Sequence, residues 1–458
     1  MRPTQELFSD LLAQGCSFRY QPERFCELEG GGHPYPSLTR TVSTPSGDMI
    51  EELIQPVLQP IVLDQRLVAN VRKASAAWPT FLGVQLELFR AAQKGELSGS
   101  DVALIRGMCT EREWKCGLVE PGYRTIHPFI RLDAVLTDDG FKVIDINSTR
   151  PAGVGDLLGF HVAMNGSDGS GIKPFPIGCS FSRIVSSCVG DWASAKHLPG
   201  ESIPVDIVVR HTDGDWNNFR NLSRQLARSG LNTRLIEPDE LRSGEPSAIV
   251  RGRIKEGDPA YAILQQGYPN ERCVMSPLYR RFLGNKVWMY LFRIPPFSEH
   301  FKRVMGEAYQ LFDRLFPPIG LFSGTSVRFP EGFLDIAKLD RQEWVLKDPA
   351  SSSGRRMYLG YLMGKKKWAD ALAQMQDGWI VQRFYRATEK LAVAGPCGEP
   401  IEESLFTKYG IYIFGSELAG LEFNARKMPV VHGARNTYCN AVYETAGPSS
   451  CAGELGAQ

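Results

Sequence analysis

FIRLDAVLTDDGFKVIDINSTRPAG, residues 129–153, alternates apolar and polar side chains on both sides of an Asp-Asp-Gly turn. This alternation predicts an antiparallel β-hairpin that turns through residues 138–140. Residues two apart on a strand share a face, so Arg131 and Asp133 should point the same way, as should Asp145 and Asn147. Folding about the turn would bring the two pairs together on one face of the hairpin.

That face offers two carboxylates, a carboxamide and a guanidinium. Oxygen ligands of this kind suit Mg²⁺, which prefers carboxylates together with phosphate oxygens of a bound nucleotide. The alternative is a solvated hairpin face with a surface ion pair.

Composition limits the classes of function. The chain has 458 residues, enough for two or three domains. Its 52 basic and 51 acidic residues balance, so we expect neither nucleic acid nor a membrane as the main partner. The ten cysteines form no Cys-x-x-Cys pair or zinc cluster, and no secretory or membrane-spanning segment is recognisable. These features predict a soluble, cytoplasmic protein with reduced thiols.

The spacing of apolar residues predicts several helices and strands. From Asp48 to about Glu113 the spacing of apolar residues predicts helices, cut by Pro56, Pro60 and Pro79. Near residues 201–275, strand and helix patterns alternate, which predicts a small parallel α/β unit. The expected domains are a helical N-terminal region (1–120), a metal-binding part (121–200), the small α/β unit (201–275), a nucleotide-binding part (276–445) and a disordered tail (446–458).

Three polar positions in the nucleotide-binding part could contact a nucleotide. Lys286 lies between a basic cluster and an apolar helical stretch, and Lys347 ends a predicted strand before a loop of small residues. Such a loop can close over phosphates with its N–H groups while a lysine neutralises them. Gln382 ends another predicted strand, where it could bind an adenine edge. Each could instead be an ordinary surface or strand-end residue.

The order of these motifs resembles the circularly permuted ATP-grasp ligases, a group that includes glutathionylspermidine synthase and eukaryotic glutathione synthetase. The resemblance covers roughly residues 120–445. It rests on Arg131-x-Asp133 with Asp145-x-Asn147, then the α/β unit, Pro277 with Asn285-Lys286, a Val-Leu-Lys strand ending at Lys347, Val-Gln at Gln382, and Gly420 with Ala425-Arg426.

The resemblance implies an α/β (α+β) ATP-grasp fold in permuted order, with ATP and Mg²⁺ as cofactors. It assigns one role to each matching residue. Asp133, Asp145 and Asn147 would bind Mg²⁺, Arg131 would contact the γ-phosphate or an acyl phosphate, Lys286, Lys347 and the loop residues Ser352, Ser353 and Gly354 would bind phosphates, Gln382 would flank adenine, and Arg426 would stabilise the tetrahedral intermediate.

Two features depart from the family pattern. The family usually has Glu where Asp145 stands. Its loop after the second lysine is usually richer in glycine and in some members carries an acidic metal ligand, whereas Ser351–Ser353 stand here.

The expected activity is an ATP-dependent ligation of a carboxylate to an amine, with an acyl-phosphate intermediate and release of ADP and phosphate. The substrates would be a small-molecule acid and an amine such as an amino acid, peptide or polyamine. Arg150 and Arg435 are candidate anchors for a substrate carboxylate. A phosphotransferase on the same scaffold, or a nucleotide-binding protein without turnover, remains an alternative. The sequence predicts no oligomeric state.

Overall fold

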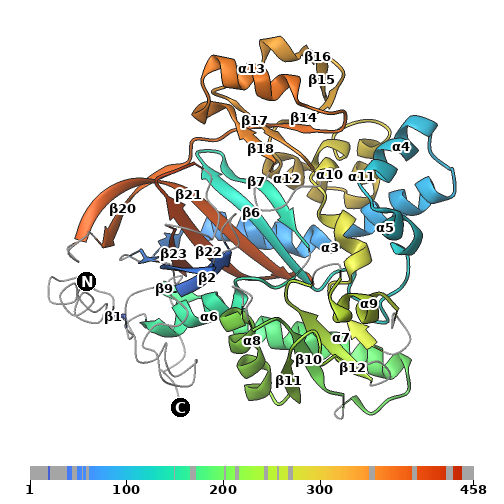
Figure 1. Ribbon diagram of the computed structural model, residues 1–458, viewed down its shortest axis with the longest axis vertical. Helices are drawn as coiled ribbons and strands as arrows, with labels where there is room; N and C mark the ends of the chain where they lie inside the picture. The colour runs from blue at the N-terminus through green and yellow to red at the C-terminus, as the bar shows by residue number, and fades with distance from the viewer. Residues whose placement is uncertain are drawn as a thin grey trace, which may run out of the picture.

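The computed structural model describes most of the chain between residues 61 and 445 and short segments before it. The described residues are 19–20, 39–43, 49–53, 55–57, 61–148, 150–165, 172–200, 203–211, 216–241, 246–254, 257–266, 272–349, 356–394, 400–429 and 437–445. They form a mixed α/β protein with sheets of nine, six and four strands (Figure 1). The expectation of an α/β fold is therefore confirmed.

The nine-stranded sheet contains the hairpin. Its main path runs β4, β23, β22, β21, β6, β7, while β20 pairs with β21, and β5 and β9 pair with β23. The bounds are β4 Gln55–Pro56, β5 Ile61–Leu63, β6 Phe129–Thr137, β7 Gly140–Asn147, β9 Ile172–Pro174, β20 Thr388–Ala394, β21 Pro400–Phe414, β22 Glu417–Arg426 and β23 Tyr438–Thr445. Segments far apart in the sequence thus share one sheet.

The β6–β7 hairpin has the register that the alternation predicts. Asp133 pairs with Asp145, and Arg131 pairs with Asn147. Gly140 follows the two-residue turn at φ +96°, a conformation that favours glycine. Side chains directly opposite each other in an antiparallel pair lie on the same face. All four polar side chains therefore share one face of the sheet.

One extra residue interrupts this pairing. After the Asp133–Asp145 pair, the next partners are Ala134 and Val143, so Ile144 is left as a β-bulge. A bulge redirects the local backbone, and such bulges are common beside functional sites.

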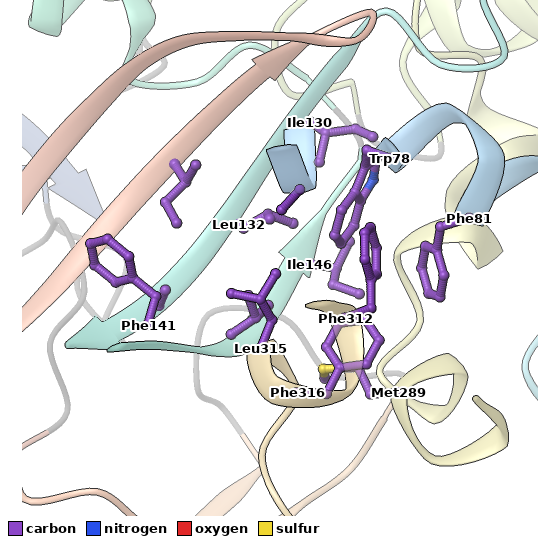
Figure 2. Packing of buried hydrophobic residues seen from close by; sticks show 14 of the residues in the cluster. Trp78, Phe81, Ile130, Leu132, Phe141, Ile146, Met289, Phe312, Leu315 and Phe316 are labelled. Carbon is purple, nitrogen blue, oxygen red and sulfur yellow. The ribbon is translucent and has the colours of Figure 1, made fainter. Parts of the chain in front are cut away.

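The opposite face of the hairpin is apolar and packs on helices (Figure 2). Leu132 and Ile146 belong to a buried cluster with Trp78 of α3 (Gln65–Gln93) and Phe312 of α12 (Ala308–Leu315). The Trp78 and Phe312 rings stack with centroids 5.1 Å apart. Burying each such side chain contributes about 1.5–3 kcal/mol. The hairpin is thus anchored from behind while its polar face stays available.

The expectation that Pro79 would end a helix is wrong, because α3 continues through this proline. Proline removes one backbone hydrogen bond at this point. Its neighbours Trp78, Phe81 and Leu82 are almost completely buried, and this packing outweighs the local loss.

The segment before α3 also differs from the prediction, which was helical from Asp48 onward. The described residues there form β3 (Met49–Leu53), paired with β2 (Thr39–Ser43), and then β4 and β5. β4 and β5 run parallel to β23. Short segments cannot satisfy most of their backbone N–H and C=O groups within a helix. They can satisfy them by pairing with a strand of a sheet. The N-terminal region is therefore not only helical.

The four-stranded sheet confirms the predicted parallel α/β unit. Its order is β11, β10, β12, β13, and all three strand pairs are parallel. The bounds are β10 Val205–Val208, β11 Thr233–Ile236, β12 Ser247–Arg251, β13 Arg272–Val274, α8 Trp216–Arg228 and α9 Pro259–Gln266. The unit lies beyond one end of the β6–β7 hairpin (Figure 1).

The six-stranded sheet lies at the other end of the hairpin, with α13 (Lys365–Ala373) beside it (Figure 1). Its order is β16, β15, β14, β19, β17, β18. The bounds are β14 Ile319–Ser323, β15 Ser326–Phe329, β16 Gly332–Asp335, β17 Trp344–Lys347, β18 Met357–Leu359 and β19 Ile380–Arg383. The hairpin therefore lies between the two smaller sheets.

The remaining elements connect these sheets. They are β1 Arg19–Tyr20 paired with β8 Met164–Asn165, α4 Gly99–Gly107, α5 Glu111–Cys116, α6 Val154–Ala163, α7 Ile177–Ala195, α10 Val287–Leu291, α11 Phe297–Met305, and the 3-10 helices η2 Leu278–Gly284, η3 Ile336–Lys338 and η4 Gly360–Leu362.

Candidate nucleotide and metal site

Asp133 holds two cations. Its Oδ1 accepts a hydrogen bond from Arg131 Nε at 2.9 Å, and its Oδ2 accepts one from Lys408 Nζ at 2.9 Å. Lys408 comes from β21, the strand beside β6. Burial alone would raise the pKa of Asp133, but Arg131 and Lys408 outweigh burial and lower that pKa to about 2. The two cations therefore favour the ionised carboxylate.

Asp145 forms an ion pair with Lys286, the first of the two predicted lysines. Its Oδ1 lies 2.8 Å from Lys286 Nζ and also accepts a hydrogen bond of 2.8 Å from the Ile146 N–H. Within the described residues, its Oδ2 makes no hydrogen bond or ion pair. Lys286 immediately precedes α10, which places its side chain at the hairpin. Asp145 therefore keeps one oxygen for a further ligand.

Lys347, the last residue of β17 in the six-stranded sheet, contacts the hairpin next to Asp145. Its Nζ donates a hydrogen bond of 3.1 Å to the carbonyl of the bulge residue Ile144 and another to Gln382 Oε1. The pKa of Lys347 is lowered to about 8, chiefly because the ammonium is buried; Lys286 contributes to the lowering, whereas Asp145 and Asp133 oppose it. Gln382 Nε2 is buried and lacks a hydrogen-bond partner in the described part of the protein.

Asn147 completes the predicted metal ligands. Its Nδ2 is buried and makes no hydrogen bond to any described residue, so it can donate to a ligand, while its Oδ1 is the atom that could bind a cation. Asp145 and Asn147 share one strand face and offer the oxygen chemistry that Mg²⁺ prefers. These residues therefore fit a magnesium ion. No group of three or more His, Cys, Asp or Glu side chains suited to a metal occurs among the described residues.

Strands β21 and β22 extend the polar face. Gly410 pairs with Asp133 on one side and with Glu422 on the other. A Cβ at Gly410 would lie 3.0 Å from Glu422 Oε2 and 3.3 Å from Arg131 Cδ. Tyr412, opposite Arg131, has its hydroxyl 3.1 Å from Glu422 Oε2. The small residue at 410 leaves room for the larger charged groups.

Arg426 ends β22 on the same face. It lies two and four residues beyond Asn424 and Glu422, and the pairing of β22 with β21 is regular over this part. The predicted Arg426 therefore shares a sheet face with the hairpin carboxylates, although two strand positions separate its row from that of Lys408.

A second group of cations lies where β12 ends. Arg251 is almost fully buried; its Nε donates to Ser276 O at 3.0 Å, and its Nη2 has no hydrogen-bond partner among the described residues. Burial, followed by the charges of Arg150 and Arg281, lowers the pKa of Arg251 to about 9. The Arg251 guanidinium forms no ion pair with a carboxylate among the described residues, whereas Arg281 pairs with Glu113 at 3.7 Å. The arrangement is therefore suited to an anionic ligand, and one of its members is the predicted anchor Arg150.

Some predicted residues lie outside the described part of the chain. These are Ser352, Ser353 and Gly354 of the small-residue loop, and the anchor Arg435.

The sequence interpretation missed Lys408, Gly410, Glu422 and Arg251. The available signals were two charged residues at the ends of apolar stretches. Lys408 begins KYGIYIF (408–414), and Arg251 ends AIVR (248–251). Neither shows which distant residue it meets.

Comparison with known proteins gives a shared fold. No protein family and no curated relative matches the chain. The structure is similar to that of a glutathione synthetase like-effector from Globodera pallida in its apo form. The TM-score is 0.54 at 13% identity, over 93% of this chain and 96% of that one. At this identity the likeness shows the fold alone.

A second solved structure, the inferred gamma-glutamylcysteine synthetase of Methylobacillus flagellatus KT, gives a TM-score of 0.33 at 12% identity, over 78% of this chain and 85% of that one. This similarity is too low to support an argument. None of the described helices is long and apolar enough to cross a lipid bilayer.

Proposed function

We propose that this protein is an ATP-dependent carboxylate–amine ligase of the permuted ATP-grasp type, forming an amide bond and releasing ADP and phosphate. The convergence of Lys286 and Lys347 on the β6–β7 hairpin carries the proposal, because Lys286 pairs with Asp145 and Lys347 donates to the Ile144 carbonyl next to it. The fold shared with a glutathione synthetase like-effector supports it.

The nucleotide would lie between the hairpin and the six-stranded sheet. Lys286 and Lys347 would neutralise its phosphates, assisted by the loop that contains residues 352–354. Gln382 would donate its unpaired buried Nε2–H₂ to the nucleotide. A buried donor without a partner is costly, so a ligand that accepts from it is favoured.

Asp145 and Asn147 would hold Mg²⁺, with Asp133, the third predicted ligand, beside them. The ion would neutralise phosphate charge and help to orient the transferring group. Asp145 Oδ2 and the Asn147 amide have no other partner within the described residues.

The acid substrate would carry an anionic group toward Arg251. The Arg251 guanidinium is buried beside Arg150 and Arg281, and Arg281 also pairs with Glu113 at 3.7 Å. An anion would accept a hydrogen bond from Arg251 Nη2, which donates to no described residue. This arrangement favours an acid with a second charged group remote from the reacting carboxylate.

The reaction has two displacement steps. A carboxylate oxygen attacks the γ-phosphorus of ATP, which forms an acyl phosphate and expels ADP. The amine then attacks the acyl carbon, loses a proton and expels phosphate. Arg131 would hold the transferring phosphoryl group, and Arg426 the oxyanion of the second step. Neither step needs a covalent enzyme nucleophile.

The test is to incubate the protein with ATP, Mg²⁺ and pooled amino acids, short peptides and polyamines, and to measure ADP, phosphate and new amide products by mass spectrometry. We expect ADP release to require both an acid and an amine. Lys347→Met should abolish it, whereas Lys366→Met, which removes an exposed lysine of α13, should not.

Each alternative has its own outcome in this assay. A stable phosphorylated acid that forms without an amine would identify a phosphotransferase. Nucleotide binding without ADP release from any pool would identify a binding protein. Positional isotope exchange in γ-¹⁸O-labelled ATP, with an acid but no amine, would report the acyl phosphate directly.

A further inference from the structure

Lys408 occupies a position in the site that no sequence motif assigned. It lies on β21, whose backbone pairs with β6 on one side and β22 on the other. The residue is 7% exposed, and Asp133 is its polar partner, at 2.9 Å. The cation is therefore fixed beside the hairpin by two strand pairings.

Each oxygen of Asp133 already has a cation as its partner. One oxygen accepts from Arg131 and the other from Lys408, each at 2.9 Å. A divalent ion bound to Asp133 would lie against both cations in a buried site, where repulsion between like charges is strong. Asp145 differs, because one of its oxygens has no partner among the described residues.

The charge balance of this sheet face also argues against a metal ion at Asp133. Four cations, Arg131, Lys286, Lys347 and Lys408, surround the two carboxylates Asp133 and Asp145. Glu422 and Arg426 of the same face add one charge of each sign. The site therefore carries an excess of positive charge before any metal binds, and it can neutralise part of a triphosphate by itself.

We infer that Lys408 serves as a built-in cation at Asp133, so that the nucleotide-bound site takes one divalent metal ion, held by Asp145 and Asn147, and not two. Lys408 is a positioning residue here, and Asp133 organises cations without ligating metal. This inference rests on the proposed nucleotide site and narrows its predicted set of metal ligands.

The test counts metal ions. The full-length protein is saturated with a non-hydrolysable ATP analogue and excess Mn²⁺, and bound Mn²⁺ per nucleotide-loaded chain is measured by equilibrium dialysis with electron paramagnetic resonance of the free ion. We expect one Mn²⁺ in the unmodified protein and two in Lys408→Met, where Asp133 becomes open to metal. The double variant Lys408→Met/Asp133→Asn should return to one.

Two controls accompany the count. Lys408→Arg keeps the charge and should stay at one ion. Lys390→Met removes an exposed strand lysine that pairs with Glu402 at 3.2 Å and should also stay at one. Circular dichroism would verify folding of each variant.

Contrary results separate the two proposals. Two Mn²⁺ in the unmodified protein would overturn this inference and leave the nucleotide site intact, and that measurement needs no variant to fold. One ion in Lys408→Met would also overturn it. Failure of the unmodified protein to bind the analogue with Mn²⁺ would remove the proposed function, and this inference with it.

Discussion

The ammonium of Lys347 donates a hydrogen bond of 3.1 Å to the carbonyl of Ile144. The two residues belong to different sheets, and the acceptor is the bulged residue of the hairpin. The bulge therefore turns a backbone carbonyl toward a buried lysine, which also donates to Gln382 Oε1. This contact joins the six-stranded sheet to the hairpin carboxylates.

Nucleotide binding should depend on the charge of Lys347. Its pKa is lowered from 10.5 to about 8 by burial and Lys286, so the free protein loses this charge as pH rises through about 8. A bound phosphate favours the protonated form, so binding above about pH 8 should take up a proton and weaken by up to about tenfold per pH unit.

Calorimetry in two buffers of different ionisation enthalpy at about pH 9 measures that proton uptake. Lys347→Met should abolish the uptake. Equal proton uptake in Lys347→Met would assign it to another group.

The same pKa predicts a change in stability without ligand. Between about pH 8 and 10.5 the unfolded chain binds the Lys347 proton more strongly than the folded protein does. The free energy of unfolding should therefore contain a contribution from Lys347 that rises with pH in this window, by up to about 1.4 kcal/mol per pH unit. Urea unfolding across these pH values, compared with Lys347→Met, isolates the contribution.

Asp145 should be needed as a carboxylate rather than for its length. Asp145→Asn removes the charge that pairs with Lys286 at 2.8 Å, and affinity for the metal–nucleotide complex should fall roughly 100-fold. Asp145→Glu keeps the charge and should stay within about tenfold of the unmodified protein. Isothermal titration with a non-hydrolysable analogue and Mg²⁺ compares them, and unchanged binding by Asp145→Asn would exclude it as a metal ligand.

Arg251 should control binding of the acid. With the nucleotide analogue present, sulfate as an anion probe should raise the melting temperature of the unmodified protein, because it binds the folded state. In Arg251→Met the sulfate affinity should fall roughly tenfold or more, the size expected for a lost charged hydrogen bond. Arg124→Met, at an exposed arginine paired with Asp191, should keep the shift. Equal shifts in both variants would place the anion elsewhere.

Gly155 should be required where α6 meets α8. A Cβ there would lie 2.1 Å from the carbonyl oxygen of Asn218, whose side chain accepts from the Gly155 N–H at 2.6 Å. Gly155→Ala should lower the free energy of unfolding by about 1–3 kcal/mol.

Gly190 is the matched control for that prediction. It lies exposed within α7, and a Cβ there would meet nothing within 4 Å. Gly190→Ala should raise the free energy of unfolding by about 0.5–1 kcal/mol. Urea titrations measure both changes, and a destabilisation of similar size in both variants would show that the contact with Asn218 is not the cause.

The fold was predictable where its signals are local. Alternation with period two, together with the Asp-Asp-Gly turn, gave the hairpin and the shared face of Asp133 and Asp145. The strand–helix alternation likewise gave the parallel unit. The prediction failed before residue 64, because the apolar spacing of Leu53, Val57 and Ile61 also fits a helix, while pairing with distant β23 produces strands.

The sequence by itself determined which side chains the hairpin presents, because strand geometry fixes the faces of residues two apart. Only the tertiary structure decided which cation each carboxylate meets. Lys408 lies 275 residues from Asp133, and Lys286 and Lys347 come from other elements again. Such contacts depend on how sheets and helices pack together, and no local pattern of residues encodes that packing.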